Sequence, residues 1–144
     1  MKAGSAFRVR KILVAVDGSA ASLHAVDMAA QMAQALASEL AVLHVIPLTE
    51  LPTLVAEAEE DRGEEHGQLA LGAAVKVARL RGARPSVVLK RGHVADQILR
   101  HVARWRPDLL VMGSRGMSRA KGFLLGSVSQ AVSQRAPCSV VIVR

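Results

Sequence analysis

Three glycines and a serine near the end of the chain stand at a spacing that could bind phosphate: Gly113-x2-Gly116-x9-Gly126-Ser127. The apolar run over residues 109–112 is typical of a buried strand, and residues 128–135 can form a helix with Ser127 as its N-cap. Such a connection turns backbone N–H groups toward an anion and places a helix N-terminus behind them. Glycine permits positive φ and lets a phosphate approach without a Cβ in its way. The pattern therefore indicates a cradle for nucleotide phosphates, with a glycine-rich surface loop as the alternative.

Positive charge and a second turn motif accompany this cradle. Three basic residues lie in the same segment: Arg115, Arg119 and Lys121. Arg115 could neutralise phosphate charge, or it could be a solvated loop side chain. Far earlier in the chain, Asp17-Gly18-Ser19 follows an apolar run over residues 9–16, which is typical of a central strand covered on both faces. We expect Ser19 to be the N-cap of the next helix.

Apolar runs bounded by turn residues predict five strands, over residues 9–16, 40–46, 85–91, 109–112 and 139–143. Segments with helical spacing separate the strands. The helix before residue 80 is expected to be long, with a frayed or broken first half, because glycines interrupt its acidic sequence. This alternation predicts an α/β fold: a single doubly wound domain with a parallel sheet and helices on both faces.

The glycine spacing resembles the phosphate-binding signature of the ATP-binding universal stress proteins. The resemblance continues along nearly the whole chain, in the family's order, over residues 12–19, 43–45, 92–116 and 136–143. It implies a Rossmann-like fold, similar to the adenine nucleotide alpha hydrolases, with the strand order 3-2-1-4-5. In that order the carboxyl ends of strands 1 and 4 flank the expected ligand crevice. Asp17 and Gly113, at the ends of these strands, would then converge.

The resemblance also implies a role for each residue of the site. Asp17 would accept hydrogen bonds from the ribose hydroxyls. The phosphates would be held by Gly113, Gly116, Gly126, the Ser127 hydroxyl and the backbone N–H of Val128. The base pocket would be lined by Ala15, Val16 and Leu40, with the Leu40 backbone reading the adenine edge. The implied ligand is ATP, or ADP or AMP, with Mg²⁺ bound through the phosphates because this ion shares ligands with phosphate oxygens.

Composition limits the other classes of protein. The 144 residues are expected to form one domain over residues 1–144, with residues 1–8 as a loose basic arm. No apolar run approaches the roughly 18 residues of a membrane span, and the single cysteine, Cys138, suits a reducing cytoplasm. The net charge of +7 raises nucleic acid as a partner, but the charge is spread along the chain and tyrosine is absent. Any such binding should be weak and non-specific.

Several other functions lack their motifs. The chain has no P-loop, no G-x-G-x-x-G after its first strand, and no H-x-G-H of the nucleotidyl transferases. Its histidines show no spacing that suits a metal; His44 is interpreted as a hydrogen-bonded core residue, and Cys138 as a small buried hydrophobe. The acidic segment over residues 50–65 is interpreted as a solvated face, with a metal site as the alternative.

These observations predict a small cytoplasmic ATP-binding regulator or sensor of the stress response. Hydrolysis should be slow at most, because no residue stands out that could orient a nucleophile, so the chain is not expected to be a metabolic enzyme. The alternative is an interaction module of the same fold, with its cleft empty or filled by AMP, that acts through a protein partner. A homodimer is expected through the apolar edge strand 139–143.

Overall fold

Five parallel strands form the centre of the computed structural model, which describes residues 6–48, 53–116 and 125–144. In these ranges the strands are β1 (Lys11–Ala15), β2 (Glu39–Pro47), β3 (Ser86–Gly92), β4 (Leu109–Gly113) and β5 (Ser139–Val143). They lie in the order β3-β2-β1-β4-β5, and every neighbouring pair is parallel. This confirms the predicted sheet and its strand order. The order reverses between β1 and β4, so their carboxyl ends flank the crevice in which doubly wound sheets bind ligands.

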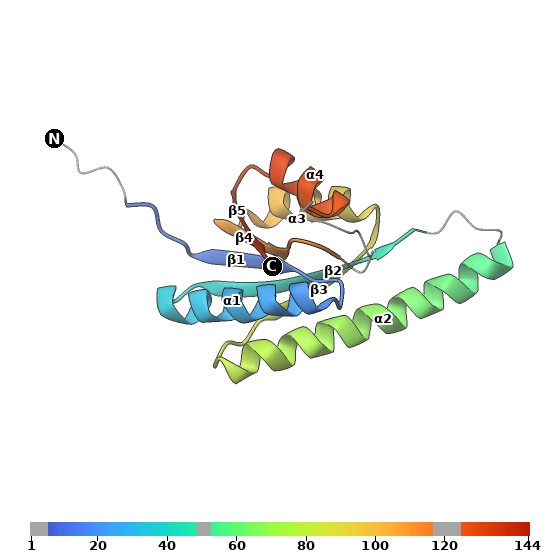
Figure 1. The fold of residues 1–144 in the computed structure, drawn as a ribbon, viewed down its shortest axis with the longest axis horizontal. Coiled ribbons are helices and arrows are strands. Elements are labelled where there is room, and N and C mark those ends of the chain that lie inside the picture. The colour runs from blue at the N-terminus through green and yellow to red at the C-terminus, as the bar shows by residue number, and fades with distance from the viewer. Residues whose placement is uncertain (1–5, 49–52, 117–124) are drawn as a thin grey trace.

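Helices cover both faces of the sheet. The described ranges contain α1 (Ala20–Leu36), α2 (Thr53–Leu80), α3 (Val94–Trp105) and α4 (Ser127–Arg135). Helices α1 and α2 lie on one face, and α3 and α4 lie on the other (Figure 1). Successive side chains of a strand point to opposite faces, so Ile12 and Val14 pack in the cluster with α1 and α2, while Leu13 packs with α3 and α4. All three are fully buried, as the continuous apolar run predicts.

Helix α1 begins at the predicted cap. The Ser19 side chain accepts a hydrogen bond from the Ser22 N–H at 3.2 Å, which confirms Ser19 as the N-cap. Small residues then line the buried side of the helix: Ala25, Ala29, Ala30 and Ala33. Because an alanine side chain is short, the helix axis can lie close to the sheet, and this brings the start of α1 against the end of β4.

Helix α2 is unbroken from Thr53 to Leu80, contrary to the expectation of a broken first half. A Cβ atom at Gly63 would lie 2.8 Å from Ile46 Cγ2, and one at Gly67 would lie 2.8 Å from His44 Cδ2. These glycines therefore let the helix lie directly on β2, and this packing offsets their low helix propensity. The N-terminal end of α2 extends past the strands, so the acidic side chains of residues 57–65 are mostly exposed, as predicted (Figure 1).

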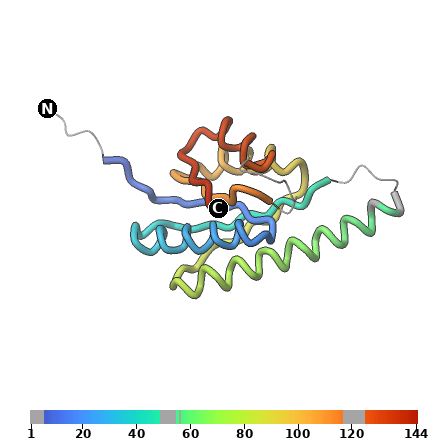
Figure 2. Tube along the Cα trace, in the orientation of Figure 1, coloured from blue at the N-terminus to red at the C-terminus, as the bar shows by residue number. Residues whose placement is uncertain are grey.

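Three other expectations concern the ends of elements. Helix α4 has Gly126, not Ser127, as its N-cap; Ser127 is already its first helical residue. Residues 6–8 are exposed and lead away from the sheet toward the N-terminus (Figure 2), whereas the rest of the predicted arm lies outside the described residues. The predicted turn at 49–52 and the loop with Arg119 and Lys121 also lie outside them. No helix in the described ranges is long and apolar enough to cross a membrane.

Candidate functional site

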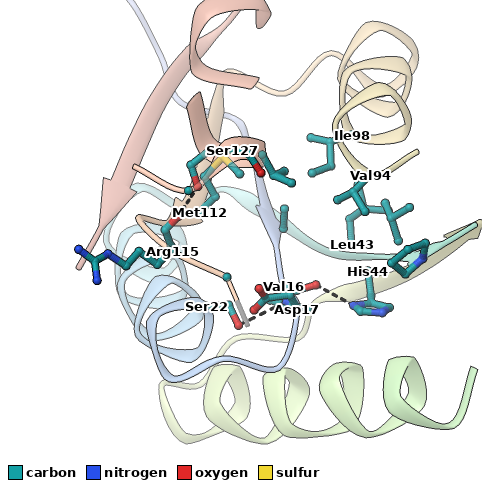
Figure 3. Close-up of a pocket in the computed structure, with 18 of the residues that line it drawn as sticks. Val16, Asp17, Ser22, Leu43, His44, Val94, Ile98, Met112, Arg115 and Ser127 are labelled. Atoms are coloured by element: carbon teal, nitrogen blue, oxygen red, sulfur yellow. Dashed lines mark hydrogen bonds between the residues drawn. The ribbon is translucent and has the colours of Figure 1, made fainter. Parts of the chain in front are cut away.

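A cavity of about 370 Å³ lies at the carboxyl ends of β1, β2 and β4, at the point where the strand order reverses. Its wall brings together two segments that are far apart in sequence, the turn after β1 and the connection from β4 to α4 (Figure 3). Of the predicted site residues, those that line it are Ala15, Val16, Asp17, Gly113, Arg115, Gly116, Gly126, Ser127 and Val128. The predicted convergence of Asp17 and Gly113 is therefore present in the structure.

One end of the cavity is built from backbone amides. The first hydrogen bond within α4 runs from the Gln130 N–H to the Gly126 carbonyl at 2.9 Å, so the N–H groups of residues 127–129 have no acceptor inside the helix. The helix start is held in place by Ser129, whose Oγ donates to the Gly113 carbonyl at 2.7 Å. A second bond joins the Gly126 N–H to the Ser114 carbonyl at 2.8 Å. This end can hold an anion, because helix N-termini carry partial positive charge.

The glycines of this connection are required for different reasons. The described glycines with positive φ are Gly18, Gly82 and Gly92, so the left-handed conformation expected in the cradle is not what Gly113, Gly116 or Gly126 supply. A Cβ atom at Gly113 would lie 3.0 Å from the backbone of Ala21, so this position must be glycine for α1 to pack on β4. At Gly126 the nearest atom would be 3.5 Å away. With respect to the described residues, Gly126 is thus a position that accepts a Cβ atom at ordinary van der Waals distance.

Asp17 connects the two segments. Its Oδ1 accepts a hydrogen bond from the Ser19 N–H at 2.9 Å, which holds the carboxylate over the turn. A Cβ atom at Gly116 would lie only 2.5 Å from Oδ2, so the carboxylate reaches the glycine connection. Ser19 Oγ also donates to the Arg115 carbonyl at 3.5 Å. A carboxylate between an apolar space and an anion site is well placed to accept hydrogen bonds from a sugar.

The other end of the cavity is apolar. Beside Ala15 and Val16, the apolar residues here that sequence reasoning missed are Leu43, Val45, Pro47, Val94 and Ile98. It also missed Met112, which lies beside Ser127 (Figure 3), and the polar lining residues Ser22, His44, His66 and Ser129. Leu40 does not line the cavity: it pairs with Ile12 near the amino end of β2 and is buried against the α1 and α2 layer. The cleft of this fold lies at the carboxyl ends of the strands. Residues just before Pro47, where β2 ends, are therefore better placed to line it than Leu40 is, and Val45 is one of them.

The turn after β1 is also held by two histidines. His44 Nδ1 lies 2.8 Å from the Val16 carbonyl oxygen, and His66 Nε2 lies 2.8 Å from the Asp17 carbonyl oxygen. His44 is only 4% exposed, so the prediction of a hydrogen-bonded core histidine is confirmed. Burial lowers the pKa of its imidazole below the usual value, because the charged ring would lose its water. Among the described residues, no group of three or more histidine, cysteine and acidic side chains could hold a metal ion.

In the part of the chain that the structure describes, positive charge at the anion end comes from the N-terminus of α4. The backbone of Arg115 lines the cavity, whereas its side chain extends away from the other lining residues in Figure 3. Cys138, outside the cavity, is half-buried, and burial raises the pKa of its thiol. The cavity therefore presents an apolar end, a carboxylate and an amide-rich end in succession. A base, a sugar and a phosphate follow one another in the same way in a nucleotide.

Comparison with known proteins agrees with this geometry. Residues 8–144 match the model of the universal stress protein family. The chain belongs to this family. Universal stress protein YxiE of Bacillus subtilis is 37% identical over an alignment of 145 positions, which covers 93% of this chain and 98% of the relative. The resemblance found in the glycine spacing is thus confirmed over almost the full length of the chain.

Solved universal stress proteins share the fold. The structure of UspA from Lactobacillus plantarum is similar with a TM-score of 0.86 at 25% identity, over 96% of this chain and 99% of that one. A crystal structure of a universal stress protein in complex with cAMP has a TM-score of 0.71 at 28% identity, over 96% of this chain and 98% of the other. A member of the family with this fold therefore binds an adenine nucleotide.

Proposed function

We propose that this universal stress protein binds an adenine nucleotide, with ATP as its main ligand, in the cavity at the carboxyl ends of β1 and β4. The observation that carries this proposal is that one cavity holds three kinds of surface in order: an apolar end at Ala15 and Val45, the Asp17 carboxylate, and the backbone amides at the start of α4. The cAMP complex of a relative supports the choice of adenine. Mg²⁺ would bind through the phosphates, since it keeps few protein ligands of its own when a nucleotide supplies oxygens.

In this proposal the protein is a cytoplasmic regulator of the stress response that works by binding. ATP, ADP and AMP differ in the number of phosphates presented to the α4 terminus, so the bound state could report the adenylate supply to a protein partner. Hydrolysis would be slow, because phosphoryl transfer needs a group that orients the attacking water as well as the electrostatic cradle. An interaction module with an AMP-filled or empty cleft remains the second candidate, and nucleic-acid binding should be weak.

The test uses Gly126, where an added Cβ atom would make only ordinary van der Waals contact with the described residues. ATP with Mg²⁺ should stabilise the wild-type chain by RT ln(1 + [L]/Kd), about 2.7 kcal/mol at a hundredfold excess over Kd. For a domain of this size, the melting temperature should rise by on the order of several degrees. Gly126→Val should remove most of this rise, because a branched side chain would occupy the space at the start of α4 that a phosphate needs.

The matched control is Gly72→Val on α2, where a Cβ atom would have no atom of the described residues within 4 Å. It carries the same substitution away from the cavity and should keep the full ATP-induced rise, whatever its own melting temperature. Gly113→Val is unsuitable, because its side chain would clash with α1. A full rise in Gly126→Val would exclude the glycine connection as the phosphate site. No rise in wild type with ATP, ADP or AMP would favour the interaction module.

A further inference from the structure

Two histidines from different elements meet at the turn that carries Asp17. His44 lies on β2 and His66 on α2, and their rings meet edge to face with 5.8 Å between centroids. Each bonds one of two successive carbonyl oxygens, those of Val16 and Asp17, at 2.8 Å. A carbonyl oxygen only accepts hydrogen bonds, so His44 Nδ1 and His66 Nε2 must carry hydrogen. The turn after β1 is therefore held by two imidazole N–H groups.

The neighbouring glycines leave room for these rings. Gly18 has φ +87°, and a Cβ atom there would lie 3.1 Å from His66 Cε1. A Cβ atom at Gly67 would lie 2.8 Å from His44 Cδ2. In the described part of the chain, His44 Nε2 is buried and has no hydrogen-bond partner, which costs folding free energy. The histidine pair is thus accommodated by both the turn and α2, although the buried ring is not the most stabilising choice for a core.

The position of Asp17 depends on this turn. On the side of α1, the Asp17 N–H reaches Ser22 Oγ at 3.4 Å, a longer contact than either imidazole bond. The Asp17 carboxylate faces Gly116 so closely that a single carbon atom added there would overlap it. A shift of the turn by less than an ångström would therefore change the separation between the carboxylate and the glycine connection. Small displacements of this kind can weaken the binding of a ligand that spans both.

We propose that His44 and His66 are positioning residues that hold Asp17 at the sugar end of the cavity. This inference rests on the proposed function, because it assigns Asp17 to the ribose hydroxyls of the bound nucleotide. It adds that α2 is linked to nucleotide affinity through His66, which lines the cavity together with His44. By reciprocity, a nucleotide that tightens the turn would also hold α2 more firmly against it.

The experiment compares two ligands in the presence of Mg²⁺: ATP, and dideoxy-ATP, which lacks both ribose hydroxyls. Titration calorimetry on the folded wild type should show tighter binding of ATP. In His66→Leu, the affinity for ATP should fall roughly three- to tenfold, the value of one hydrogen bond, while that for dideoxy-ATP stays within about twofold of wild type. His66 is exposed, so this variant should fold. His66→Gln should keep the wild-type ratio of ATP affinity to dideoxy-ATP affinity, because the glutamine side-chain amide can donate a hydrogen bond from the position of Nε2.

Two further variants separate positioning from general damage to α2. Gln68→Leu, an exposed neighbour on the same helix, should leave both affinities unchanged. His44→Asn keeps a donor near the position of Nδ1 and should retain more of the preference for ATP than His44→Leu does. The inference is overturned if His66→Leu keeps the wild-type ratio of ATP affinity to dideoxy-ATP affinity, or if Gln68→Leu lowers the ATP affinity as much as His66→Leu does. It is also overturned if wild type binds both ligands equally. Wild type that binds neither ligand would instead overturn the proposed function.

Discussion

Gly113 and Gly126 belong to one motif, yet the structure gives them different tasks. Gly113 is glycine because the first turn of α1 comes within 3.0 Å of where its side chain would start. Gly126 has no such neighbour among the described residues, which lie 3.5 Å or more from its added Cβ atom at the start of α4. The motif therefore combines a packing requirement with a binding requirement. Only the binding requirement, at Gly126, concerns the ligand. Substitutions at Gly126 therefore report on ligand binding with the least disturbance of the fold.

His44 makes the stability of the fold depend on pH. Burial lowers the pKa of its imidazole below the usual 6.5, with a smaller lowering by His66 and opposing effects from the Val16 carbonyl and Asp17. The unfolded chain therefore takes up this proton at a higher pH than the folded chain does. Above pH 6.5 the titration of His44 should leave the free energy of unfolding unchanged. As pH falls below 6.5, the free energy of unfolding should decrease by at most about 1.4 kcal/mol per pH unit for this one proton.

Urea denaturation of wild type and His44→Asn measures how much His44 contributes to the pH dependence of stability. The range from about pH 5 to pH 7.5 spans roughly the ordinary titration of histidine. The asparagine does not titrate, so the variant should lose less stability than wild type as pH falls, even if it is less stable throughout. Some slope should remain, because burial and the nearby Lys90 and Arg104 also lower the pKa of His101. Equal slopes in the two proteins would show that His44 does not titrate differently on folding.

At the scale of elements, close approach of α2 to β2 determines where His66 lies. A Cβ atom at Gly63 would come within 2.8 Å of the buried Ile46 side chain. Gly63→Ala should therefore destabilise the fold by about 1–3 kcal/mol, although alanine is the better helix former. Gly72→Ala, whose Cβ atom would have no described atom within 4 Å, should stabilise the fold by up to about 1 kcal/mol. Denaturant titrations that gave both variants the same sign would contradict this account of α2.

The sequence was most informative where neighbours along the chain decide the structure. Apolar runs predicted all five strands, and Asp17-Gly18-Ser19 predicted the start of α1. It was less informative where the deciding neighbour is distant. Leu40 and Val45 look alike in one apolar run, and only the direction of β2 relative to the cleft separates them. The contact of His66 with Asp17, 49 residues apart, depends on α2 returning beside the turn after β1.

At the scale of the whole molecule, β5 is an edge strand of the sheet, paired on one side with β4, and it carries half-buried apolar residues such as Val141 and Ile142. An apolar edge strand tends to pair with another strand, and a two-fold axis would make the pairing antiparallel between copies. We predict a homodimer through β5. Light scattering at micromolar concentration should give twice the chain mass of 15.3 kDa. A monomer at that concentration would contradict this prediction.

The central claim is that one cavity holds base, sugar and phosphates in that order, and a crystal structure with ATP and Mg²⁺ tests it most directly. The account predicts adenine beside Ala15 and Val45, ribose hydroxyls within hydrogen-bond distance of the Asp17 carboxylate, and phosphates at the N–H groups of the first residues of α4. Density for the nucleotide at another site would contradict it. So would an empty cavity in crystals soaked at a concentration that saturates binding in solution.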